Sequence, residues 1–232
     1  MSKWQVEDSV DKIFQAVFGR NNPYDIQTLE EKFAFDIKLP TEVKDSTTGE
    51  ITYTAAPNAK QFIKDANSQV YGDDKGWIQP KCEIKSLDQI LDLWQKINLM
   101  TTERAYNCEN VQKSDPVYDS TNVYKSTNCG ACHDIIFCDG TYESNFAMAC
   151  QRSTGLNYCL RVDDSSSCTN SYNVICSGKV SNSMFIQDCG ELHECIFCSH
   201  ISNREYHIAN MPFKEAEYFA LKAKILEWIF KA

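Results

Sequence analysis

Two Cys-x-x-Cys segments are the residues of this chain whose types and spacing could do chemistry. The first, Cys129-Gly130-Ala131-Cys132-His133, matches the sequence that attaches c-type haem, where both thiols bind the vinyl groups and the histidine binds the iron. The second contains Cys195 and Cys198, and the two segments together resemble the halves of a four-thiolate zinc site. The chain has four histidines, and all lie near these segments: His133, His193, His200 and His207. One hypothesis is therefore a zinc-binding or c-type haem protein using Cys129, Cys132, His133, Cys195 and Cys198.

The same cysteines belong to a longer repeat. Cys108, Cys129, Cys150, Cys168 and Cys189 recur at sequence intervals of 21, 21, 18 and 21. A second column follows eight or nine positions later, at Val117, Cys138, Cys159, Cys176 and Cys198, and a third is aromatic, at Phe146, Phe185 and Tyr206. Ser, Asn and Gly residues with turn propensity lie between the columns. Three inward columns predict a three-sided parallel β-solenoid of about five coils, or roughly 24 Å at the spacing of paired strands.

This repeat favours a structural role for the thiols. Cys is small, apolar and among the most buried residue types, so we expect each column to be buried and mostly reduced. The positions of Cys132 and Cys195 differ by three of the longer intervals. That separation is three coils of the predicted solenoid, or roughly 14 Å, whereas zinc holds its sulfurs at about 2.3 Å. We therefore expect no metal, no cofactor and no shared zinc site, although a site within one coil or between neighbouring coils stays possible.

Composition and motifs exclude several functions. The formal net charge of −9 and the sequence pI near 5.0 disfavour partners that are nucleic acids or anionic membranes. The sequence has no Walker A, G-x-G-x-x-G, H-E-x-x-H or G-x-S-x-G motif, so we expect no catalytic residues and no enzyme. Residues 1–8 lack the apolar segment of a signal peptide, and no Asn-x-Ser/Thr sequon occurs, so we expect a reducing compartment.

Local patterns predict the elements around the repeat. Residues 1–105 form an α+β N-terminal domain, with a helix over 6–18 that ends at Gly19 and a β-hairpin over 33–54 with its turn at 45–49. The apolar stripe of the first helix either packs within its own domain or docks onto a partner. A short helix is expected over 58–66, and another begins near Ser86 with Gln89 completing a capping box. The solenoid occupies 106–210, and an amphipathic helix over 211–232 caps its last coil.

The stretch Ser202-Asn203-Arg204-Glu205-Tyr206-His207-Ile208-Ala209-Asn210, followed by residues 212–218, carries a resemblance. It is similar to the end of uncharacterised Cys/Ser/Asn-rich repeat proteins of candidate-phyla bacteria and large tailed bacteriophages, although His207 stands where that family usually has Cys. The resemblance covers about 130 C-terminal residues. It implies a β-solenoid and a virion component, assembled in the host cytoplasm, with a capsid-associated or decoration role. The implied partners are other virion or assembly proteins, and homo-oligomers are possible.

Overall fold

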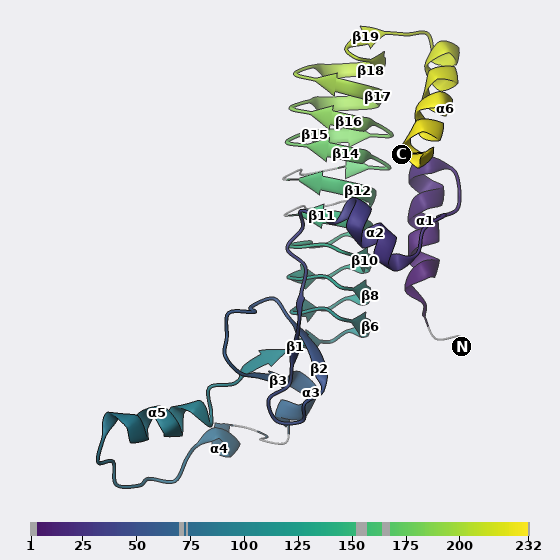
Figure 1. The fold of residues 1–232 in the computed structure, drawn as a ribbon. Coiled ribbons are helices and arrows are strands. Elements are labelled where there is room, and N and C mark those ends of the chain that lie inside the picture. Colours follow the sequence, from purple (N-terminus) through teal and green to yellow (C-terminus); the bar gives the residue numbers. More distant parts are fainter. Residues whose placement is uncertain (1–3, 70–71, 73, 152–156, 164–167, 232) are drawn as a thin grey trace.

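The protein is a rod built on a parallel β-solenoid (Figure 1). The computed structural model describes residues 4–69, 72, 74–151, 157–163 and 168–231. The solenoid makes about eight turns, so the predicted fold class is confirmed but the predicted count of five coils is wrong. At about 4.8 Å per turn, the rod is close to 38 Å long. Its strands in chain order are β5 (Ala105–Tyr106), β6 (Glu109–Gln112), β7 (Val117–Tyr118), β8 (Thr121–Tyr124), β9 (Cys129–Gly130), β10 (His133–Ile136), β11 (Asn145–Gln151), β12 (Asn157–Asp163), β13 (Cys168–Thr169), β14 (Tyr172–Ile175), β15 (Gly178–Ser181), β16 (Met184–Gln187), β17 (Gly190–Ser199) and β18 (Ser202–Ile208).

Each coil has 12 residues and is therefore much shorter than the coil that the cysteine spacing predicted. The parallel register pairs His133 with Thr121 before it and with Asn145 after it, and the same shift of 12 continues to the pairing of His193 with Glu205. Between Asn107 and Ala209, every third described residue except Pro116 has a positive φ, which gives four corners per coil. The 12-residue coil thus has four sides of three residues each, so the predicted three-sided coil is wrong.

The predicted cysteine columns are therefore wrong. The spacings of 21 and 18 are multiples of three, so they preserve the three-residue period of the inward positions, but neither spacing is a multiple of 12. Cys108, Cys129 and Cys150 consequently lie on three different sides of the coil, and the inward partner of Cys129 in the preceding coil is Val117. Cys176 falls off the inward positions and is exposed, while the side chain of Cys168 lies outside the described residues.

The interior is narrow and is filled by small side chains. Its buried residues are Cys, Ser, Val, Ala, Thr, Ile and Leu, with no Phe, Tyr or Trp among the described residues. An inward serine such as Ser126 donates its hydroxyl to the carbonyl of Tyr124 and accepts the backbone N–H of Cys138 in the next coil. An inward cysteine such as Cys138 donates to the carbonyl of Ile136 in the same way. Both residue types therefore satisfy backbone groups at the corners of the coil.

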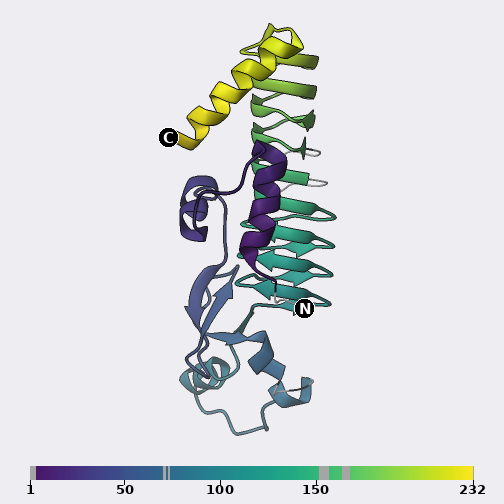
Figure 2. The ribbon, with the colours of Figure 1, turned by 90° about the vertical axis from the view of Figure 1, so that its right-hand side faces the viewer.

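A second, outer apolar column has the same 12-residue period. It joins one residue from each coil and packs against three helices that cover this side of the rod (Figures 1 and 2). Its members are Tyr124, Ile136, Met148, Leu160, Tyr172, Met184, Ile196 and Ile208. The helices are α1 (Val6–Phe18), α2 (Ile26–Phe33) and α6 (Glu215–Lys231). The apolar stripe of α1 is buried by this contact, so it is an internal packing face and not a docking element.

The C-terminal helix lies along the side of the solenoid and not over its end (Figure 2). Its Phe230 contacts Phe14 and Phe18 of α1, with ring centroids 6.2 and 5.1 Å apart. The exposed edge of β18 is instead paired by β19 (Met211–Pro212), which is antiparallel to it. The prediction of a C-terminal helix is confirmed, but a short strand, not the helix, covers the last coil.

The remaining N-terminal elements form a small unit at the other end of the rod (Figure 1). They are the antiparallel hairpin β1 (Thr41–Lys44) and β2 (Ile51–Thr54), the parallel pair β3 (Phe62–Lys64) and β4 (Met100–Thr102), and the helices α3 (Asp65–Ser68), α4 (Asp74–Trp77) and α5 (Leu87–Gln95). The hairpin is confirmed from residue 41, but its predicted start is wrong because α2 extends to Phe33. The helix expected over 58–66 is wrong for most of its length: residues 58–61 are irregular, 62–64 form β3, and helix α3 begins only at Asp65.

Candidate functional site

The first Cys-x-x-Cys segment has its thiols inside the coil and its histidine outside. Cys129 and Cys132 are buried on adjacent sides of the interior. Burial raises the pKa of both thiols. His133 is half-exposed on the outer surface, where its Nδ1 lies 2.5 Å from an oxygen of Asp134. Attachment of haem needs both thiols and the histidine on the same accessible side, so this placement does not fit that chemistry.

The second segment is distant from the first. Cys195 and Cys198 are also inward and buried. At the observed length of the coil, the separation between Cys132 and Cys195 is just over five coils, or roughly 25 Å. The neighbouring Cys198 thiol and burial both raise the pKa of Cys195. The hydrogen bond with Cys195 lowers the pKa of Cys198 to about 6. Zinc binds thiolates, so Cys195, which is protonated and donates to the carbonyl of His193, is a poor ligand. Cys198 alone does not make a zinc site.

The other histidines are spread over the surface of the last coils. His193 lies beside Ser181, and His200 lies 3.8 Å from a carboxylate oxygen of Asp188. His207 occupies the inward position one coil after Cys195, and its Nδ1 donates to the carbonyl of Glu205. No group of three or more His, Cys, Asp or Glu in the described part of the chain could hold a metal ion.

Helix α5 exposes a row of large apolar side chains. The helix begins as predicted, with the Ser86 hydroxyl accepting the N–H of Gln89, but none of its residues is buried. One face carries five large apolar side chains that are 36–68% exposed: Leu87, Ile90, Leu91, Trp94 and Ile97. We call this surface the α5 face. Contiguous exposed apolar surface of this kind marks interaction sites on soluble proteins.

The α5 face lies at one end of the rod, away from the three helices that pack on the solenoid (Figures 1 and 2). Its five apolar positions contain no charge, and the acidic Asp88 and Asp92 lie toward the opposite side of the helix at 100° per residue. An uncharged apolar centre with charges around it is the usual anatomy of a protein interface. The sequence also shows the apolar stripe of this helix, but a docking role was considered only for residues 6–18, as one of two alternatives, because exposure cannot be read from periodicity alone.

These features define a capped, four-sided β-solenoid with an exposed apolar face on helix α5. In the described residues no helix is long and apolar enough to cross a membrane. No protein-family model, curated protein or solved structure matches the chain.

Proposed function

We propose that the protein is a non-enzymatic structural component, a rigid rod that assembles through the α5 face with a second copy of itself. The observation that carries this proposal is the exposure of the complete apolar stripe of α5. A helix that is buried on no side within its own chain gains stability by burying that stripe elsewhere, and each apolar side chain contributes roughly 1.5–3 kcal/mol when fully buried.

The spacing of the α5 face is self-complementary. Consider an antiparallel pair of α5 helices whose two-fold axis passes at the level of Asp92 along the helix. Leu87 then lies opposite Ile97, Ile90 opposite Trp94, and Leu91 opposite Leu93 of the second copy. Apolar residues therefore meet apolar residues along the whole contact, as a two-fold symmetric interface requires. The antiparallel arrangement also opposes the two helix dipoles and brings the Asp88 end of one helix to the Lys96 end of the other. A second copy is thus a complete partner for this face.

The bacteriophage setting belongs to the same proposal. A capsid-associated or decoration role, with assembly in the host cytoplasm, is supported by the sequence resemblance of the C-terminal part of the chain. A rod with one attachment face at its end suits a spacer or surface component of a particle. Zinc or haem binding is the weaker hypothesis, because the thiols of both Cys-x-x-Cys segments face the filled interior.

Self-association is tested by sedimentation velocity of the full chain over a wide range of concentrations. The wild-type protein should form dimers, and Ile90→Glu should weaken the dimer at least tenfold, which is about 1.4 kcal/mol, because it places a carboxylate at the centre of the α5 face. Gln95→Glu adds the same charge beside the face and should leave the dimer intact. Since Ile90 is exposed and no residue of α5 is buried, the variant should keep the wild-type circular dichroism spectrum.

Two results would contradict the proposal. A wild-type chain that stays monomeric at every concentration would exclude self-association, and dimers that persist equally in Ile90→Glu would place the interface elsewhere.

A further inference from the structure

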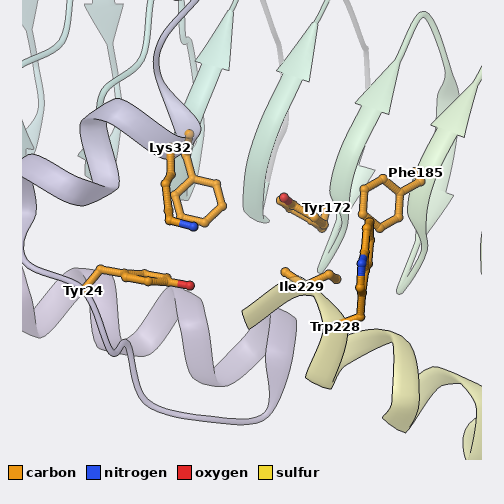
Figure 3. A pocket seen from close by; sticks show the side chains of 7 residues that line it. Tyr24, Lys32, Tyr172, Phe185, Trp228 and Ile229 are labelled. Carbon is orange, nitrogen blue, oxygen red and sulfur yellow. The ribbon is translucent and has the colours of Figure 1, made fainter. Parts of the chain in front are cut away.

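A cavity of about 230 Å³ lies where α2, the solenoid and α6 meet (Figure 3). Three separate parts of the chain line it. Tyr24, Lys32 and Phe33 come from the α2 region, Tyr172 and Phe185 from β14 and β16, and Trp228 and Ile229 from α6. Pockets for drug-sized ligands begin at roughly 300 Å³, so this cavity suits a smaller molecule of about one ring.

The walls of the cavity are aromatic. Phe33 and Tyr172 meet edge to face with centroids 6.0 Å apart, and Phe185 lies 6.0 Å from Trp228. Tyr24 is held by stacking on Phe230 of α6. These rings offer both their faces and their edges to a planar aromatic ligand. Aromatic pairs favour the two arrangements that result, offset stacking and edge-to-face contact.

One cation lies at this cavity without an acidic partner among the described residues. The Lys32 ammonium is 5.1 Å from the centre of the Tyr24 ring. Of the two acids of the same helix, Glu30 is paired with Lys125, and Glu31 accepts a hydrogen bond from Gln27. Figure 3 shows the Lys32 nitrogen and the hydroxyl groups of Tyr24 and Tyr172 turned toward the middle of the pocket. Burial raises the pKa of Tyr172, so its hydroxyl remains a hydrogen-bond donor at neutral pH.

We infer that this cavity binds a small aromatic carboxylate. The ring of the ligand lies against Phe33, Phe185 and Trp228, while its carboxylate accepts hydrogen bonds from Lys32 and the tyrosine hydroxyls. Aromatic pockets also attract quaternary ammonium ions, but the Lys32 ammonium repels a second cation. The site is independent of the α5 face, which lies at the far end of the rod.

The test uses the full chain and benzoate as the probe, measured by isothermal titration calorimetry in low-salt buffer. Benzoate should bind saturably with a Kd on the order of 1 mM. Lys32→Met keeps the length of the side chain and removes its charge, and it should weaken benzoate at least tenfold. Lys12→Met is the matched control, because Lys12 also lies over an aromatic ring, that of Phe146, but outside this cavity. Its benzoate affinity should equal that of the wild type.

Thermal unfolding gives an independent readout. A ligand that joins α2, the solenoid and α6 stabilises the folded state, so benzoate should raise the Tm of the wild type and of Lys12→Met but not of Lys32→Met. Benzamide, which lacks the charge, should bind much more weakly than benzoate. Absence of saturable benzoate binding, equal affinity in Lys32→Met, or tighter binding of choline than of benzoate would each overturn the inference.

Discussion

Serine and cysteine make one hydrogen bond in common inside this solenoid. Each is small enough for the narrow interior of the coil, and each donates to the carbonyl two residues before it, as Ser126 and Cys138 do. Some cysteines also reach a carbonyl nine residues ahead, as Cys132 does to Thr141. His207 makes the equivalent bond in the last coil, where the interior opens. The cysteine-rich composition therefore reflects the size of the interior and its backbone hydrogen bonds, without any need for metal.

This equivalence predicts the effect of changing Cys138. Cys138→Ser should lower the free energy of unfolding by about 1 kcal/mol or less, because Ser126 already fills the same side of the preceding coil. Cys138→Leu should cost about 1–3 kcal/mol through overpacking. Urea denaturation measures both changes. Cys176→Ser is the control and should have almost no effect, since Cys176 is exposed. Equal losses for the Ser and Leu variants of Cys138 would refute the size argument.

Among the elements, the β1–β2 hairpin is fixed by one buried carboxylate. Asp45 accepts the backbone N–H groups of Thr47 at 2.7 Å and Lys64 at 2.8 Å, and also the Asn67 amide at 2.8 Å. Burial by itself would raise the pKa of Asp45, but the hydrogen bonds from Thr47, Asn67 and Lys64 lower it far below the usual range. Asp45 thus ties the turn to β3 and α3.

The sign of this shift gives a pH prediction. A lowered pKa in the folded state means that the charged Asp45 stabilises the protein above the unfolded-state pKa of about 3.9, and that this stabilisation is lost as the pH falls further. Asp45→Asn should therefore lower the free energy of unfolding by about 1–3 kcal/mol at pH 7. The difference from the wild type should shrink below about pH 4. Urea denaturation at both pH values measures it, with exposed Asp92→Asn as a control. A difference that does not change with pH would show that the charge is not responsible.

Elements with strong local signals could be predicted from the sequence. The helix ending at Gly19, the turn at 45–49 and the Ser86 cap each depend on residues within a few positions of one another. The length of the coil could not be obtained from the cysteines, because their spacings preserve only the three-residue period. The outer apolar column did carry the 12-residue period in the sequence, from Tyr124 to Ile208. The cavity at Lys32 could not be predicted, because its walls come from segments far apart in the chain.

At the scale of the whole molecule, two periods act together. The three-residue period keeps small side chains in the interior, and the 12-residue period keeps one outer apolar side chain per coil under α1, α2 and α6. The first period forms the solenoid, and the second attaches the helices to it. Lys222 of α6 strengthens this attachment through its ion pair with Glu194, at 2.6 Å and largely buried.

Two deletions separate these periods. Removing residues 178–189 takes out one complete coil, so Ile196 and Ile208 should remain on the side that the helices cover. Removing residues 178–186 takes out fewer residues and preserves the three-residue period, but it turns every later coil by one corner. Ile196 and Ile208 then leave the outer apolar column, and the start of α6 moves away from it. Each apolar side chain exposed in this way costs roughly 1.5–3 kcal/mol.

We therefore expect the 12-residue deletion to melt cooperatively with a wild-type-like circular dichroism spectrum. The nine-residue deletion should bind a hydrophobic dye and melt at a lower temperature or aggregate. The opposite order of stability would contradict the 12-residue coil, because no other feature of the described chain makes the larger deletion the milder one.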